Sequence, residues 1–199
     1  MRIVILTTAA ALSATVALAA GAELRRPEAF DAVQDRVERS VALFEEMAKV
    51  ITHPRCMNCH PADGIPRQGD DRRLHHPPMV RGGEASFGPS GLHCNSCHGS
   101  ENLPVLGHDK DIPGHAPWQL APASMAWMGL SVGEICVQLK DPERNGGRSL
   151  AAIHEHHATD GLVGWGWHPG KGREPVPGTQ KIFGDLTQAW IDTGAACPK

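Results

Sequence analysis

The sequence predicts a mainly helical protein with long irregular loops, arranged around one stretch between Cys56 and His98. Three observations support this fold class. Apolar residues recur at helical spacing in residues 28–51 and 179–194. The 22 glycines and 16 prolines are spread along the chain and interrupt longer periodic segments between these two regions. A short cysteine–histidine motif occurs twice, and no alternating strand pattern surrounds either copy.

The duplicated motif is C-x-x-C-H: residues 56–60 are C-M-N-C-H and residues 94–98 are C-N-S-C-H. This spacing is the attachment signature of c-type haem. Two thiols at this separation each form a thioether bond to one haem vinyl group, and the histidine that follows binds the iron as its proximal ligand. The sequence therefore predicts two covalently bound c-type haems, held by Cys56, Cys59, His60, Cys94, Cys97 and His98.

Two other uses of paired cysteines explain the pattern less well. Zinc sites built from two C-x-x-C pairs usually separate the pairs by roughly 15–20 residues. The gap from Cys59 to Cys94 is much longer, and zinc binding leaves His60 and His98 without a role. A thioredoxin-like redox motif would need one C-x-x-C in a βαβ context. We therefore favour haem attachment.

The two motifs lie too close together in the chain to belong to two successive cytochrome domains. We expect residues 23–199 to form a single compact diheme cytochrome c-like body in which the haems fill much of the core. Aromatic packing would rest on five tryptophans, because the chain has four phenylalanines and no tyrosine. The polypeptide without haem should be poorly folded.

Residues 1–22 have the pattern of a secretory signal peptide. A basic start at Arg2 precedes an uncharged apolar run over residues 3–19, and small residues follow at spacings suited to cleavage. The alternative is an uncleaved anchor, although the run is short for a membrane span. No later segment is apolar enough to cross a bilayer. We expect an exported, soluble protein of the periplasm.

The first helix is expected over residues 28–51, with Pro27 at its start and Pro54 ending it before Cys56. Apolar residues recur there at three- and four-residue steps, at Phe30, Val33, Val37, Val41, Phe44, Ala48 and Ile51. This stripe would pack on the first haem or against the C-terminal helix. Residues 61–91 are then expected to be almost wholly loop, because proline and glycine interrupt every period.

That loop carries His75-His76-Pro77-Pro78-Met79, in which prolines push the preceding residues toward extended geometry. Such a segment can place a side chain across a haem face. We predict His76, ahead of Met79 and His75, as the distal ligand that completes the first iron with His60. The alternative is that these histidines are solvent-exposed and bind nothing.

Met125 and Met128 are the candidate distal ligands for the second haem, and we favour Met125 paired with His98. A thioether ligand would raise the reduction potential relative to a second imidazole. Either methionine could instead fill a gap in the core beside the haem.

Further helices are expected in the last third of the chain. Ser131 and Glu134 form a capping box that opens a helix to about Lys140. Residues 148–157 form another short helix, whose His154, His156 and His157 do not match the H-E-x-x-H zinc spacing. These histidines would line a haem or lie on the surface, and His156 is the reserve distal ligand.

Residues 161–178 are expected to be a loop, in which Trp165 and Trp167 would pack over a haem edge or form a docking surface. Residues 179–194 form the closing helix, ended by Gly194. Cys136 and Cys197 lie outside the haem motifs. In an oxidising compartment this pair favours a disulfide, the alternative being two separate thiols.

The chain as a whole resembles the diheme c-type cytochromes. Within them, four segments resemble a bacterial family labelled as cytochrome subunits or partners of isoquinoline 1-oxidoreductase-type molybdenum hydroxylases: residues 118–122, 145–148, 163–167 and 190–198. The resemblance implies electron transfer from a partner dehydrogenase to the respiratory chain. A nucleic-acid partner is not expected, because the net charge is −3 and no basic face is indicated. The alternative function is a diheme peroxidase with one open haem face, for which the chain is short.

Overall fold

The structure, a computed structural model, describes residues 23–83, 88 and 91–199 and is mainly helical, as the sequence predicts. The predicted signal peptide lies outside the described residues. The elements in chain order are η1 (Pro27–Phe30), α1 (Arg36–Ile51), α2 (Pro54–Met57), β1 (Arg67–Gln68), β2 (Arg73–Leu74), η2 (Cys94–Ser96), η3 (Ala123–Met125), α3 (Val132–Leu139), α4 (Leu150–Thr159), α5 (Gly161–Gly164), η4 (Trp165–Trp167) and α6 (Gln180–Asp192).

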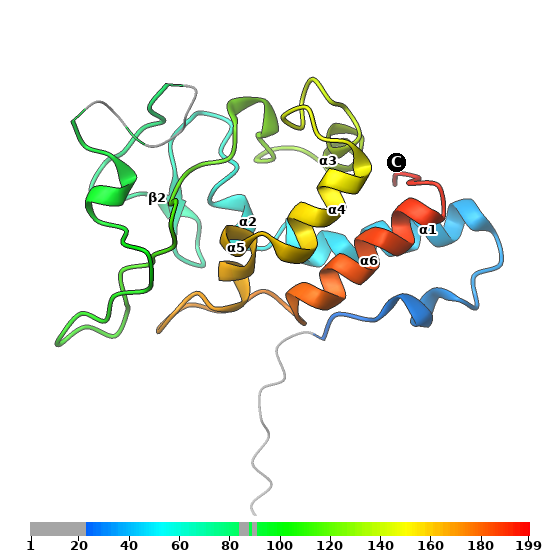
Figure 1. Cartoon of the computed structure of the whole chain (residues 1–199), viewed down its shortest axis with the longest axis horizontal. Helices are drawn as coiled ribbons and strands as arrows, with labels where there is room; N and C mark the ends of the chain where they lie inside the picture. Colours follow the sequence, from blue (N-terminus) through cyan, green and yellow to red (C-terminus); the bar gives the residue numbers. More distant parts are fainter. Residues whose placement is uncertain (1–22, 84–87, 89–90) are drawn as a thin grey trace, which may run out of the picture.

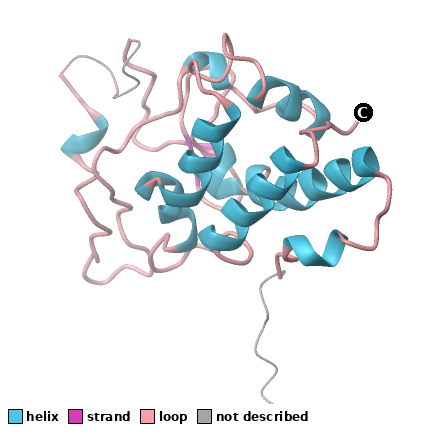
Figure 2. Ribbon diagram, turned by 45° about the vertical axis from the view of Figure 1, so that its right-hand side comes forward, coloured by secondary structure: helices cyan, strands magenta, loops and turns pink. Residues whose placement is uncertain are grey.

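Two parts of the molecule differ in their architecture (Figure 1). Helices α1, α3, α4 and α6 pack together on one side, and we call them the helical half. On the other side lie the described residues of 61–118, which we call the loop half; its regular structure is limited to η2 and short strand pairings (Figure 2). The sequence motifs fall at the boundary between these halves and inside the loop half.

Helix α1 begins at Arg36, so the prediction of a helix from residue 28 is wrong in its first third. The carboxylate of Asp35 accepts hydrogen bonds from the backbone N–H groups of Val37 and Glu38, at 2.8 and 2.9 Å. This N-cap satisfies the first amide groups of the helix and fixes its start. Of the early apolar positions, Phe30 is buried in the core from the separate turn η1, whereas Val37 is 61% exposed.

The core of the helical half forms where α1 and α6 pack together. The rings of Phe44 and Trp190 lie 5.2 Å apart, and both side chains are fully buried. Of the two packing partners predicted for the first helix, the C-terminal helix is therefore confirmed. Helix α4 lies against the other side of α6, where a Cβ on Gly184 would come within 2.7 Å of the Ala158 Cβ. Only glycine permits this close approach.

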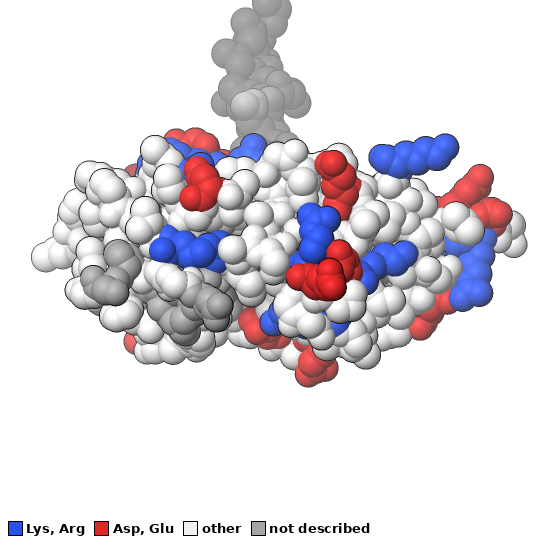
Figure 3. All heavy atoms as spheres, turned by 90° about the horizontal axis from the view of Figure 1, so that it is seen from above, with Lys and Arg blue, Asp and Glu red and all other residues white. Residues whose placement is uncertain are grey.

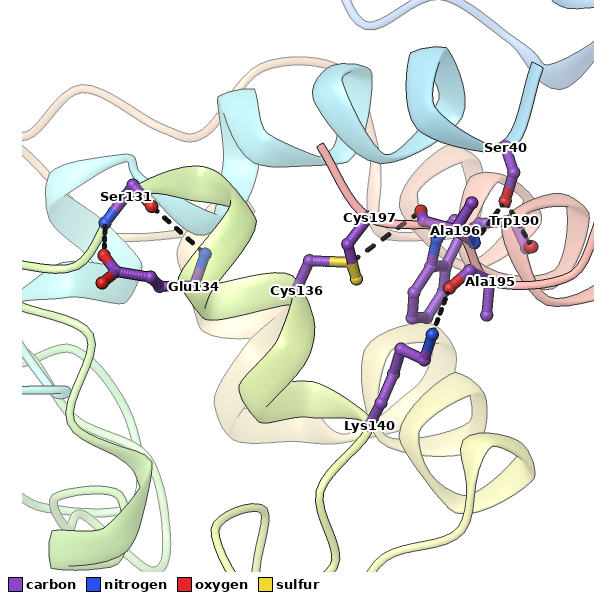
Figure 4. Close-up of a disulfide and its surroundings, with 9 residues drawn as sticks. All are labelled: Ser40, Ser131, Glu134, Cys136, Lys140, Trp190, Ala195, Ala196 and Cys197. Atoms are coloured by element: carbon purple, nitrogen blue, oxygen red, sulfur yellow. Dashed lines mark hydrogen bonds between the residues drawn. A yellow bond between two sulfur atoms is a disulfide. The ribbon is translucent and has the colours of Figure 1, made fainter. Parts of the chain in front are cut away.

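The C-terminal segment is tied to α3 by the Cys136–Cys197 disulfide, which confirms that prediction (Figure 4). Lys140 Nζ donates to the Ala195 carbonyl at 2.7 Å, and Trp190 Nε1 donates to the Ala196 carbonyl at 2.9 Å. The Ser131–Glu134 capping box that opens α3 is also present. These contacts fix α3 to the C-terminal segment that follows α6.

The predicted boundaries are close for α4 and α6 and wrong for the segment between them. Helix α6 starts after Thr179, whose hydroxyl accepts from the Ile182 N–H, and the chain turns at Gly194 with φ 107°. Residues 161–167, predicted as loop, form α5 and η4. The Asp160 carboxylate caps this turn by accepting from two backbone N–H groups. The glycines in this segment interrupt the apolar periodicity from which a helix is predicted.

Two short antiparallel pairings shape the loop half, where residues 61–91 were predicted to be almost wholly loop. Strand β1 pairs with β2, with Arg67 opposite Leu74. Leu103 and Ile112 exchange two backbone hydrogen bonds of 2.9 Å in an isolated bridge. Asn102 joins this bridge to η4, since its Oδ1 accepts from Trp165 Nε1 at 2.8 Å. The bridge is therefore held in a defined position against η4.

On the face shown in Figure 3, basic and acidic side chains are interspersed, in keeping with the small net charge. Within the described ranges, none of the helices combines the length and apolar character that crossing a bilayer requires.

Candidate haem-binding sites

The first motif starts in α2, which follows α1 after a short turn. Pro54 occupies the first turn of α2, where a missing N–H costs least. The backbone N–H of Cys59 donates to the Cys56 carbonyl at 3.1 Å, and the N–H of His60 donates to the Met57 carbonyl at 3.2 Å. These turns bring the two thiols and the imidazole to one cavity of about 410 Å³. Its volume falls in the usual range for ligand sites.

The imidazole of His60 is oriented by a backbone carbonyl. Its Nδ1 lies 2.7 Å from the carbonyl oxygen of Met125, which can only accept, so Nδ1 carries the proton and Nε2 keeps its lone pair. The ring stacks on Trp127 with centroids 3.5 Å apart. Burial lowers the pKa of His60 to about 4. The side chain is therefore a neutral imidazole, the form that binds metals.

The second motif repeats this arrangement on a different scaffold. Residues Cys94–Ser96 form η2, and the backbone N–H of His98 donates to the Cys94 carbonyl at 3.0 Å. His98 Nδ1 donates to the Pro113 carbonyl at 2.6 Å, and its ring stacks on Trp118 at 4.8 Å. Burial lowers the pKa of His98 as well. Cys94, Cys97 and His98 line a second cavity of about 420 Å³.

The four motif thiols are free, and three of them are partly buried. Burial raises the pKa of Cys56 to about 12 and that of Cys59 to about 11. It raises the pKa of Cys94 too. These side chains are therefore neutral thiols near pH 7, and Cys97 is the exposed member of the set.

The distal candidates lie in the opposite cavities to those predicted. His76, expected beside His60, lines the second cavity with His75 and Met79. Met125, expected beside His98, lines the first cavity. The prediction paired each candidate with a motif by its distance along the chain, which does not reveal the path that the chain takes. Residues 61–83 lead away from the first motif, and several of them line the cavity of the second, whereas the chain after residue 118 returns to the first motif.

The returning segment is fixed to the first motif by backbone hydrogen bonds. The N–H of Ala121 donates to the Cys59 carbonyl, and the N–H of Trp127 donates to the His60 carbonyl, each at 3.0 Å. Met128 packs against the hydrophobic core instead of lining the described cavities. The sequence therefore identified histidine and methionine side chains that do line cavities, but assigned them to the wrong motif.

Helix α4 contributes two histidines to the first cavity, His156 and His157. His157 Nδ1 lies 3.0 Å from the hydroxyl of Thr187, which itself donates to the Phe183 carbonyl at 2.8 Å. The hydroxyl thus accepts from Nδ1, and Nε2 of His157 keeps its lone pair. Burial lowers the pKa of His157 to about 3. His156, the predicted reserve ligand, also lines this cavity, and its Nδ1 lies 3.2 Å from Asp160 Oδ2.

The two cavities share one wall. The residues that line both are Arg55, Cys59, Trp118, Gln119, Leu120 and Trp165. The Trp118 and Trp165 rings meet edge to face, with centroids 4.9 Å apart. Sequence analysis missed Arg55 and Trp118 as site residues. The signals that could have found them are their positions, directly before Cys56 and directly after Pro117.

Several buried donors without partners fit the carboxylates of haem propionates. The Arg55 side chain is 2% exposed and pairs with Asp70 through Nη2, while its Nε has no hydrogen-bond partner among the described residues. Trp127 Nε1 in the first cavity and Arg67 Nη1 in the second likewise have no hydrogen-bond partner among the described residues. Buried donors are normally satisfied, and carboxylates are strong acceptors. The thiols, the oriented imidazoles and these donors together fit haem in both cavities.

The described part of the chain contains no cluster of three or more His, Cys, Asp or Glu side chains that could hold a metal ion by itself. Comparisons with family models, curated proteins and solved structures found no match to this chain. The interpretation of the sites therefore rests on the residues and geometry described above.

Proposed function

We propose that this protein is an exported electron carrier that binds two c-type haems covalently and has a diheme cytochrome c-like fold. The observation that carries the proposal is the repeated arrangement of the two C-x-x-C-H motifs. Each places two thiols and a neutral, carbonyl-oriented imidazole at a cavity, and the two cavities share a wall. When bound, each haem would supply an iron centre that takes up and releases one electron.

The chain's own residues would hold and orient both haems. Cys56 and Cys59 would hold one haem through thioether bonds, and Cys94 and Cys97, which are likewise free thiols, would hold the other. The Met125 and Pro113 carbonyls fix the orientation of His60 and His98 and increase their basicity. The apolar walls of the cavities would exclude water, and the Arg55 Nε–H, which has no partner among the described residues, would be available to a propionate.

The shared wall supports electron exchange between the two sites. Cys59, which would hold the first haem, lines both cavities. Trp118 stacks on His98 and lines both cavities. A short path between the sites suits a relay that accepts electrons on one iron and delivers them from the other.

The proposed location and partners rest on separate observations. A disulfide between Cys136 and Cys197 is typical of an oxidising compartment, which supports the periplasm. The resemblance of residues 118–122, 145–148, 163–167 and 190–198 to partners of molybdenum hydroxylases supports a dehydrogenase as the electron donor. Respiratory-chain proteins would then be the acceptors.

A reductive titration of the haem-loaded protein tests carrier against enzyme. A carrier should take up two electrons per chain, keep both irons low-spin in each redox state and show no catalytic turnover with peroxide. A resting high-spin haem combined with rapid peroxide turnover would favour a diheme peroxidase. Titration of the C94A/C97A variant provides the matched control, because it should accept one electron per chain.

A further inference from the structure

We propose that His75, and not His76, is the distal axial ligand of the iron bound by His98. The inference rests on the proposed function, since it assigns a residue to the second haem site. The rings of His75 and His98 face the same cavity with centroids 5.9 Å apart and an interplanar angle of 64°. Among the described ring contacts, the only other residue of the loop half whose ring lies against that of His98 is Trp118, which stacks on it.

The separation of the two rings matches that of two imidazoles on one metal ion. A metal–imidazole bond is about 2 Å long and the ring centre lies about 1 Å beyond the nitrogen, so opposite imidazoles have centroids roughly 6 Å apart. The crossed planes do not conflict with this arrangement, because each axial ring can rotate about its own metal–nitrogen bond. The pair is therefore spaced for one iron between them.

The hydrogen bond that orients the His75 ring also fits a ligand. Its Nδ1 lies 2.8 Å from the carbonyl oxygen of Pro77, which can only accept, so Nδ1 carries the proton. Nε2 is then left with the lone pair that a metal requires. The same tautomer is fixed in His60 by Met125 and in His98 by Pro113. Orientation by such a hydrogen bond is usual for histidines that bind metals.

The fold holds His75 in place directly after the β1–β2 pairing. Its backbone N–H donates to the Pro66 carbonyl at 3.1 Å, which continues the strand contact by one residue. His76 is exposed, and its own backbone N–H donates to Gln68 Oε1 at 3.2 Å. Sequence analysis favoured His76 because it precedes Pro77; the structure turns the ring of its neighbour toward His98.

The test compares spin states in haem-loaded variants, with haem content determined by intact mass. His75→Ala should keep two covalent haems but convert one of the two from low-spin to high-spin, seen by electron paramagnetic resonance and absorption. Added imidazole should restore the low-spin signal. His76→Ala and the exposed control His108→Ala should leave both haems low-spin. A second variant, His75→Met, should show a methionine–iron charge-transfer band and a raised potential at one haem.

Two results would overturn the assignment. One is a His75→Ala protein with two haems that both remain low-spin. The other is loss of one low-spin haem in His76→Ala or Met79→Ala while His75→Ala is unaffected. Failure of the proposed function gives a different result, because the unmodified protein would then carry no covalent haem or would already show a resting high-spin haem with rapid peroxide turnover.

Discussion

The two candidate haem sites have the same proximal chemistry on different scaffolds. His60 and His98 each donate from Nδ1 to a backbone carbonyl, and each stacks on a tryptophan. The first cavity, however, is walled by core residues of the helical half, including Leu139, Ile153 and Phe183. The walls of the second come largely from the loop half. Local sequence therefore brings the thiols and the imidazole of each motif together, and tertiary structure supplies the carbonyl, the tryptophan and the cavity around them.

The difference in scaffold implies a difference in what stabilises each half. The helical half has a packed core around Trp190 and a disulfide, and we expect these to stabilise it without a cofactor. The loop half exposes several large apolar side chains, Leu74, Val80, Leu92, Leu103 and Leu106. Its regular pairings are limited to a few residues. We expect its order to depend on the haem that it binds.

The largest expected effect follows from removing the second attachment site. In the C94A/C97A variant, amide protection from hydrogen exchange should be lost across the described residues of 61–118, because few backbone hydrogen bonds hold that region. Helices α1, α4 and α6 should stay protected. Hydrogen exchange followed by mass spectrometry measures both regions in one experiment. Equal loss in both halves would show that they form one cooperative unit.

The converse perturbation is Trp190→Ala in the helical half. It should lower the free energy of unfolding by about 3–5 kcal/mol, the usual cost of removing a buried aromatic side chain. The control is Val37→Ala. Val37 lies on α1 but is exposed, so its substitution should change the free energy of unfolding by less than about 0.5 kcal/mol. Denaturant unfolding followed by far-ultraviolet circular dichroism measures both. The comparison between halves fails if Trp190→Ala removes amide protection from the described residues of 61–118 while leaving α1 and α6 folded.

Much of the helical half was predictable from sequence because its signals are local. The Ser131–Glu134 capping box, the closing helix and the Cys136–Cys197 disulfide are all present. The start of α1 was wrong because apolar periodicity continues upstream of Asp35, and periodicity does not reveal which polar side chain caps the helix.

The candidate sites divide in the same way. The residues of both C-x-x-C-H motifs line cavities as expected, since each set lies within five consecutive residues. The distal candidates His76 and Met125 were assigned to the wrong cavities, because their positions depend on where the chain returns after residue 118. The Ala121–Cys59 backbone hydrogen bond that fixes this return has no sequence signal.

The smallest expected effect concerns the two tryptophans that stack on His60 and His98. Trp127 lines only the first of the two cavities, whereas Trp118 lines both. Trp127→Leu should therefore shift one reduction potential and Trp118→Leu should shift two. Loss of an aromatic contact of about 0.5–1.5 kcal/mol corresponds to roughly 20–60 mV for a one-electron couple. Spectroelectrochemical titration resolves the shifts; two shifted potentials in Trp127→Leu would contradict separate cavities.

The most direct test of the central claim is the intact mass of the exported protein after denaturation, combined with peptide mapping. Two covalent haems should be found, one on the peptide containing Cys56 and Cys59 and one on the peptide containing Cys94 and Cys97. The mass should exceed that of the processed polypeptide by two haem groups, and Cys136 should remain linked to Cys197. A polypeptide with a single haem, or with all four motif thiols free and zinc bound in the native protein, would contradict a two-haem carrier.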